Sequence, residues 1–278
     1  MKRSLRVFGI LGLVFAIAVV AAGTVGASHP WGKYHWGRTS DSFTLKLGDN
    51  VTSVWDAYLQ EASSDWSTSS VLDTTVVAGS TKVRTCTPPS GRVEVCNTKY
   101  GFNGWLGVAG IWVSGDHITK GYVKFNDSYF NTSTYNTPAW RRLVTCQEIG
   151  HEFGLDHQDV NFNNANLGTC MDYTNDPDGG AGGASSNDPS NEHPNQHDYD
   201  QLESIYAHLD GTTTVGADAP TGPGRGNAGA ATGGNVDEHG LPSWASPGKG
   251  DVYVTDLGNG QKLIVHVFWI PAGLPGAR

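Results

Sequence analysis

The chain has 278 residues, of which 38% are hydrophobic and 10% aromatic. That composition supports one sizeable hydrophobic core, or one domain with a small appendage. The formal net charge of −9 argues against a surface that binds nucleic acid by neutralising its phosphates. We therefore expect a globular protein without a nucleic-acid partner.

The N-terminus has the layout of a secretory signal peptide. Lys2, Arg3 and Arg6 precede an uncharged apolar run over residues 7–22, and small residues follow at 25–27. The run approaches the length of a short spanning helix, so an uncleaved membrane anchor is the alternative. The small residues favour cleavage, and we expect residues 1–27 to be removed. The prediction is a secreted protein with no stable membrane insertion afterwards.

The chain contains four cysteines, and export permits them to form disulfides. Four cysteines allow three pairings, which sequence alone does not distinguish. Proximity favours Cys86–Cys96 across the turn at residues 88–91, and this leaves Cys146 with Cys170. No C-x-x-C spacing occurs, so we do not expect a cysteine to bind zinc.

Residues 28–210 are predicted to form one globular domain. Apolar residues recur at helical spacing over 52–66. Strand-like runs follow, and they cover residues 71–77, 92–96, 105–113 and 117–125. We interpret the third run as a buried strand and the fourth, which alternates less cleanly, as an edge strand.

The best-defined helix begins after Thr137. This residue is a suitable N-cap, and Pro138 suits the first helical position because its missing N–H costs nothing there. We expect the helix to end at Gly154, a natural residue just past a helix terminus. A long loop rich in Asn, Asp and Gly covers residues 156–195, and a last helix is predicted over 197–209.

The C-terminal part of the chain divides into a linker and a hairpin segment. Residues 211–235 are rich in Gly, Ala, Thr and Pro and are predicted to form a flexible linker. Residues 236–278 contain a predicted β-hairpin, with strands at 251–255 and 262–269 around the turn at 258–260. One hairpin is too small to be stable alone, so it must dock on the main domain or pair with something else.

The chemistry is concentrated at residues 146–157, whose sequence is CQEIGHEFGLDH. Positions 147 and 151 lie one helical turn apart and point to the same side, so both can hold one metal ion. Glu148 lies beside them, where its carboxylate can hold a water molecule. Gly154 permits a turn that swings His157 toward the same ion. Three ligands plus an open position are typical of a catalytic zinc site.

This stretch resembles the metzincin metalloprotease motif H-E-x-x-H-x-x-G-x-x-H. It matches at Glu148, His151, Gly154 and His157, and it has Gln147 where the first histidine belongs. The resemblance implies an α+β domain, matrixin-like in length, with a mixed twisted sheet, an active-site helix, a methionine-containing turn and a C-terminal helix.

The same resemblance assigns roles to two residues after the motif. Met171 would form the apolar floor of the site, and Tyr173 would stabilise the oxyanion. The implied function is a secreted zinc endopeptidase acting on protein or peptide substrates, in which Glu148 takes a proton from the zinc-activated water and passes it to the leaving amine. A catalytically inactive binding or surface protein with the same fold is the alternative.

Gln147 leaves three interpretations open. Its amide oxygen can bind zinc as a weaker donor than imidazole, or the residue can lie behind the ligands. The third interpretation is a degenerate relative that no longer cleaves peptides. We predict Gln147, His151 and His157 as the metal ligands, because every other functional position of the motif is present.

Other polar residues carry weaker signals. His117, His193 and His197 are isolated, and we do not expect them to bind metal because they lack ligand spacing. Glu152 is expected to face solvent. The acidic residues Asp172, Asp176 and Asp178, with Asn175, resemble a calcium loop but lack its full ligand pattern, so a solvated acidic loop is preferred over Ca²⁺ binding.

Overall fold

The computed structural model describes residues 28–180, 187–216, 236–270 and 272–276. The predicted signal peptide and most of the predicted linker lie outside the described residues. The described chain is a mixed α+β protein built on one eight-stranded sheet, with four helices among those residues. The strands of the sheet are β1 (His35–Trp36), β2 (Phe43–Asn50), β3 (Leu72–Ala78), β4 (Val93–Thr98), β5 (Trp105–Ser114), β6 (His117–Asn126), β7 (Val252–Gly258) and β8 (Gln261–Trp269).

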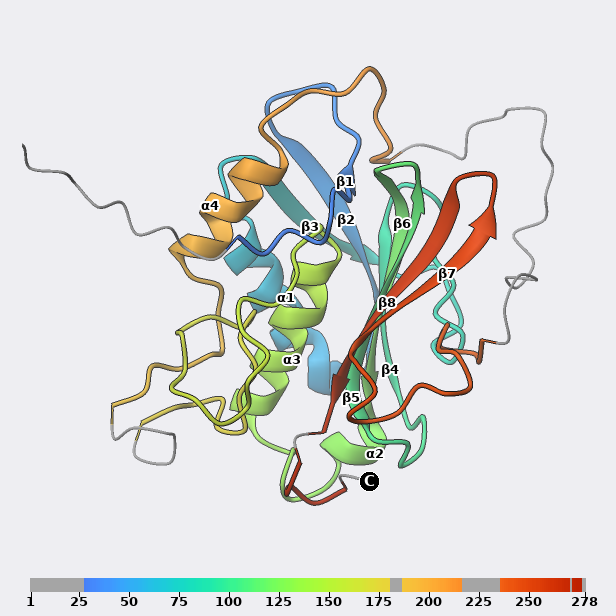
Figure 1. Ribbon diagram of the computed structural model, residues 1–278. Coiled ribbons are helices and arrows are strands. Elements are labelled where there is room, and N and C mark those ends of the chain that lie inside the picture. The colour runs from blue at the N-terminus through green and yellow to red at the C-terminus, as the bar shows by residue number, and fades with distance from the viewer. Residues whose placement is uncertain (1–27, 181–186, 217–235, 271, 277–278) are drawn as a thin grey trace, which may run out of the picture.

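The helices lie mainly on one face of this sheet (Figure 1). They are α1 (Ser53–Trp66), α2 (Asp127–Phe130), α3 (Pro138–His151) and α4 (Gln196–Ile205). The start of α3 follows the prediction, since the Thr137 side chain accepts a hydrogen bond from the Trp140 amide and Pro138 occupies the first turn. At α4, Asn195 and Asp198 form a capping box. Both helices are therefore fixed by local chemistry as well as by burial.

The strand order is β3-β2-β4-β6-β5-β8-β7, with β1 pairing to β6. Strands β2, β3, β4 and β6 run parallel, whereas β5 is antiparallel to β6. The prediction that residues 117–125 form an edge strand is wrong, because β6 lies between β4 and β5. Its polar residue Lys124 is buried, and the ammonium donates a hydrogen bond to the Glu238 carbonyl at 2.8 Å. Because this hydrogen bond satisfies the ammonium, a polar residue is tolerated in a buried strand. Lys124 interrupts the apolar pattern, and β6 therefore resembled an edge strand in the sequence.

The C-terminal hairpin extends the main sheet. Strand β8 pairs antiparallel with β5 from Ser114↔Gln261 to Trp105↔Trp269, and β7 covers the outer edge of β8 (Figure 1). Side chains of β8 alternate between two buried faces. Ile264 and Phe268 join the core beneath the helices, while Val265 and Val267 pack with Leu241 on the other face. The hairpin therefore docks on the domain rather than standing apart.

Two disulfides join the four cysteines as proximity suggested. Cys86 is bonded to Cys96, and Cys146 is bonded to Cys170. The second bond ties α3 to the segment that carries Met171. Among the described residues, no helix combines the length and the apolar composition that a membrane span requires.

Candidate metal centre

The end of α3 brings two histidines of the motif together. Gly154 follows the helix with φ of +93°, and a Cβ there would lie 2.2 Å from the Tyr34 carbonyl oxygen, so this position requires glycine. The chain then returns so that Nε2 of His157 lies 3.1 Å from Nε2 of His151. With metal–nitrogen bonds of about 2.0–2.1 Å, two ligand atoms of a tetrahedral zinc site lie about 3.3–3.4 Å apart. The separation of the two nitrogens suits a shared ion.

A hydrogen bond behind the His151 ring directs its lone pair toward His157, and a carboxylate lies behind the His157 ring. Nδ1 of His151 lies 2.8 Å from the Leu155 carbonyl, which only accepts, so Nδ1 carries the proton and Nε2 of a neutral ring carries a lone pair. Nδ1 of His157 lies 3.4 Å from the Asp251 carboxylate. A carbonyl or carboxylate behind a ligating imidazole is the usual arrangement in metal sites.

His266 completes a group of three nitrogen donors that the sequence analysis did not find. It lies on β8, opposite Ala109 of β5, and offers a ring nitrogen within 4.8 Å of those of His151 and His157. Its ring stacks on that of His151 with centroids 3.7 Å apart. We call His151, His157 and His266 the buried cluster. No local spacing could predict this contact, because His266 lies 109 positions after His157 in the sequence.

The buried cluster is screened from water. Its three histidines are at most 8% exposed, and Trp31 packs against the His266 ring with centroids 3.9 Å apart. Burial, reinforced by the neighbouring histidine rings, lowers the pKa of His151 and His266 well below the ordinary histidine value. Neither ring nitrogen of His266 has a hydrogen-bond partner among the described residues. Neutral imidazoles with unused lone pairs are the form that zinc binds, so these residues fit the metal.

Glu148 is fully buried between α3 and β5. A Cβ added at Gly107 of β5 would lie 2.4 Å from its Oε1, so the carboxylate rests directly on the backbone of that strand. Neither oxygen has a hydrogen-bond partner among the described residues, and burial raises the pKa of Glu148 well above the usual range of a carboxyl. An unpartnered buried carboxyl is costly for stability, which is typical of a functional site.

The two ends of the Gln147 amide differ in their contacts. Its Nε2 donates a hydrogen bond of 2.6 Å to the Cys170 carbonyl, which holds the side chain against the segment before Met171. Its Oε1 is buried without a hydrogen-bond partner among the described residues. That oxygen is the only atom of the side chain through which zinc binding is chemically available. Gln147 therefore stays a predicted ligand.

Tyr173 and Asp251 form the wall beside His157. The Tyr173 hydroxyl donates to Asp251 at 2.8 Å, and its ring contacts that of His157 with centroids 4.2 Å apart. Burial alone would raise the pKa of Asp251, but the contacts with His157 and the hydrogen bond from Tyr173 outweigh it and hold the value at about 2. This carboxylate, which immediately precedes β7, was not predicted from the sequence.

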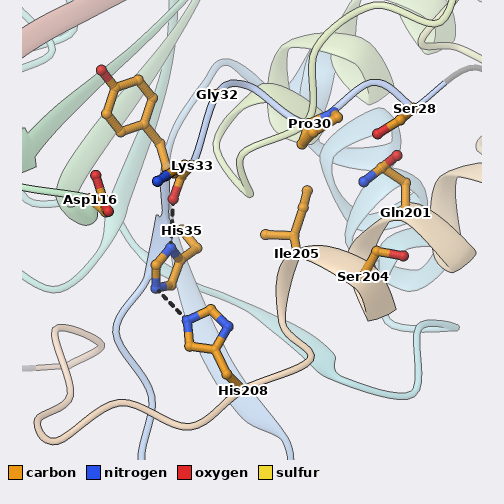
Figure 2. Close-up of a pocket in the computed structure, with 11 residues that line it drawn as sticks. Ser28, Pro30, Gly32, Lys33, His35, Asp116, Gln201, Ser204, Ile205 and His208 are labelled. Atoms are coloured by element: carbon orange, nitrogen blue, oxygen red, sulfur yellow. Dashed lines mark hydrogen bonds between the residues drawn. The ribbon is translucent and has the colours of Figure 1, made fainter.

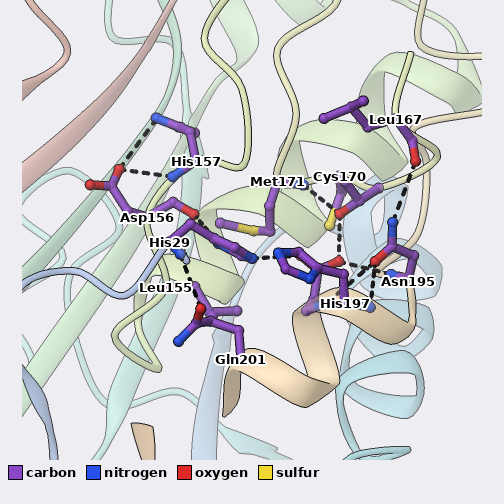
Figure 3. A network of polar contacts seen from close by, with 12 residues as sticks. His29, Leu155, Asp156, His157, Leu167, Cys170, Met171, Asn195, His197 and Gln201 are labelled. Atoms are coloured by element: carbon purple, nitrogen blue, oxygen red, sulfur yellow. Dashed lines mark hydrogen bonds and ion pairs between the residues drawn. The ribbon is translucent and has the colours of Figure 1, made fainter. Parts of the chain in front are cut away.

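The methionine predicted to floor the site is fully buried, and a Cβ at Gly150 would lie 2.6 Å from its sulfur. Figure 3 shows Cys170 and Met171 near the segment that carries Asp156 and His157. In the same view His29 joins this region to α4, since its amide donates to the Gln201 side chain and its ring contacts the Asp156 carbonyl at 2.8 Å. The N-terminal segment therefore lies against the metal-ligand loop.

The remaining polar candidates are placed as follows. His193 contacts Asp65 at 2.7 Å and the His197 ring lies beside that of His29, so neither belongs to the buried cluster. The prediction that Glu152 faces solvent is wrong, because it lies one turn after Glu148 and packs against Gly121 of β6. Asp172 is also fully buried, and it accepts hydrogen bonds from the Leu167 amide and Asn191 side chain, which corrects the prediction of a solvated acidic loop at that residue.

Comparison of the sequence with models of known protein families and with curated proteins finds no match. The assignment of a function therefore depends on the geometry of the buried cluster and its surroundings.

Proposed function

We propose that this protein is a secreted zinc-dependent endopeptidase of the metzincin type. The observation that carries the proposal is the buried cluster of three histidines with the unpartnered carboxyl of Glu148 on the same helix as His151. Zinc held by three nitrogen donors keeps a fourth position, which is typical of catalytic zinc rather than structural zinc. A Gln147 oxygen in that fourth position would be the weakest donor of the set, which a water molecule could replace.

Zinc, Glu148 and Tyr173 have separate proposed roles in catalysis. Zinc, when bound there, polarises a water molecule and the carbonyl of a peptide bond. Glu148 accepts the proton of the attacking water and later delivers it to the leaving amine, so that the carboxylate is restored. Its raised pKa favours the step in which it holds that proton. Tyr173 would donate to the oxyanion after leaving Asp251.

Substrate access requires the C-terminal hairpin to move. The buried cluster, Glu148 and Tyr173 are all shielded from solvent, and β8 lies along the side of β5 that a peptide would use to pair with the sheet. An extended peptide commonly binds by adding a strand to a sheet edge, and β8 occupies that edge here. We infer that the form with the docked hairpin is closed and that cleavage takes place when the hairpin is displaced. His266 then leaves with β8, and the Gln147 oxygen, His151 and His157 would hold the ion.

The same burial favours a second candidate function. If β8 never leaves β5, His266 is a permanent ligand and the metal serves the fold, as in a non-catalytic binding or surface protein. The two candidates differ in what Glu148 is for. In an enzyme it transfers protons, whereas in a binding protein it is an unpaired buried carboxyl without a task.

The test is cleavage of casein by the zinc-loaded protein and by Glu148→Gln, which keeps the side-chain volume. We expect the variant to lose about 100-fold or more in rate while its zinc content is unchanged, because general base catalysis contributes on this scale. Glu152→Gln is a matched control, since Glu152 is an equally buried glutamate one turn along α3. Equal rates for wild type and Glu148→Gln would favour the binding protein.

A further inference from the structure

We propose a second metal site, formed by His35, His117, His208 and Asp210, which binds zinc in a closed four-ligand geometry. These residues come from β1, the start of β6 and the segment after α4, and they lie outside the motif. We call them the outer cluster. The inference goes beyond the proposed peptidase and does not depend on it.

The donor atoms of His35, His117 and Asp210 all lie within 4.8 Å of one another, and Nε2 of His208 lies close to those of His35 and Asp210. Oδ1 of Asp210 lies 2.9 Å from Nε2 of His117, 3.4 Å from Nε2 of His35 and 3.6 Å from Nε2 of His208. Nε2 of His35 and Nε2 of His208 are 3.2 Å apart. These separations bracket the value of about 3.3–3.4 Å between ligands of tetrahedral zinc. Three imidazoles and one carboxylate are donors that zinc accepts.

Lone pairs face each other at this site unless a proton or a cation lies between them. Nδ1 of His35 donates to the Lys33 carbonyl at 2.7 Å, so Nε2 of the neutral ring carries a lone pair (Figure 2). That lone pair faces the carboxylate of Asp210, which also only accepts. In Figure 2 the His35 and His208 rings turn their Nε2 atoms toward each other, where a shared proton makes a hydrogen bond and a cation would satisfy both lone pairs.

The surroundings support the ligands. The second oxygen of Asp210 accepts the Arg38 amide at 2.9 Å, and the Asp210 amide donates to the Arg38 carbonyl at 2.8 Å, so the carboxylate is held by backbone on both sides. Bonds behind the ligands orient them for a metal. His35 is buried and Asp210 is partly buried, whereas His208 is half-exposed beside a pocket of about 380 Å³ that His35 also lines. This gives an ion a route to the site.

The position of the outer cluster suggests what the metal does. Four protein ligands leave no position for a substrate, which is typical of a structural site. The segment that ends in His35 also carries Trp31, whose ring packs on His266 of the buried cluster. Zinc at the outer cluster would fasten this N-terminal segment to β6 and to the chain after α4. It would thereby hold the cover of the buried cluster in place.

The experiment measures zinc content by elemental analysis and thermal stability with and without a chelator. We expect about two zinc ions per chain in the wild type, and about one in both His208→Ala and Asp210→Asn, because each removes a ligand of a four-ligand site. His151→Ala should also retain about one. His193→Ala, which removes a half-exposed histidine that pairs with Asp65, is the matched control and should retain both.

Cobalt, used in place of zinc, identifies the geometry. In the His151→Ala background, which disables the buried cluster, added Co²⁺ should give the visible absorption of a four-coordinate ion, and His208→Ala should abolish it. Circular dichroism checks that each variant is folded. Zinc content that is the same in His208→Ala, Asp210→Asn and wild type overturns the second site. The zinc content of His151→Ala reports on the buried cluster, and that of His208→Ala and Asp210→Asn reports on the outer cluster. Neither measurement uses peptidase activity, so the two proposals can fail separately.

Discussion

The two histidine clusters differ in ligand number and in burial. The buried cluster offers three imidazoles beneath Trp31 and the C-terminal hairpin, and the outer cluster offers three imidazoles and a carboxylate beside a surface pocket. Zinc held by three protein ligands keeps a position for chemistry, whereas zinc held by four does not. Under the two proposals the catalytic site is the better hidden one, so exposure to solvent does not separate the two proposed roles.

The largest effect is expected from removing His266, which tests whether the buried cluster has three histidine ligands. In a His208→Ala background, where only the buried cluster is measured, we expect His266→Ala to weaken zinc binding at least about 100-fold. Loss of a ligating imidazole should exceed the 10–100-fold effect of losing a residue that only supports a ligand. Competition with a chromophoric chelator gives the affinity.

His239→Ala is the control for that variant. His239 is also a buried histidine in the C-terminal part of the chain, but its ring contacts Tyr100 and Trp105 on the opposite face of the sheet. Zinc affinity that falls equally in both variants would indicate general loosening of the hairpin. Unchanged affinity in His266→Ala would reduce the buried cluster to the two histidines of the motif.

A smaller effect is expected from locking the hairpin in place. Ser114 and Gln261 are exposed and directly opposite each other on β5 and β8, so Ser114→Cys/Gln261→Cys places two thiols across the strand pair. We expect the oxidised variant to cleave casein at least about tenfold more slowly than the wild type, because the open population falls. Zinc content should stay the same.

Each single cysteine variant, treated with the same oxidant, controls for the substitutions themselves. Mild reduction should restore the rate if the engineered disulfide causes the loss. The wild type is reduced in parallel to account for its own disulfides. A locked protein that cleaves at the wild-type rate would show that substrate reaches Glu148 with β8 still docked.

Local sequence predicted much of the frame that carries these sites. The helix at α3 was predictable because Thr137, Pro138 and Gly154 are a cap, a first-turn residue and a terminator that act on their neighbours alone. The two disulfides followed from proximity. Strand β2 was missed although Phe43, Leu45 and Leu47 are buried at alternating positions, a pattern that the sequence does contain.

Long-range pairing accounts for what could not be predicted. His266 reaches the motif only because β8 pairs with β5, and no spacing rule links residues so far apart in sequence. The outer cluster is assembled from three separate segments, so His117 was isolated by every local criterion and still lies 2.9 Å from Asp210. Buried Glu152 was misplaced for the same reason, since only the sheet packing against α3 shows where its side chain lies.

The smallest effect on zinc affinity is expected from a substitution at Gln147. Gln147→His adds an imidazole one helical turn before His151, and we expect zinc affinity at the buried cluster to rise about tenfold, because imidazole is a better donor than an amide oxygen. The gain is limited because the substitution also removes the hydrogen bond that Gln147 donates to the Cys170 carbonyl. Measured in the His208→Ala background, unchanged affinity would place Gln147 behind the ligands. A rise in affinity with a fall in casein cleavage would show that a fourth strong donor closes the position that catalysis needs, making the buried cluster resemble the outer one.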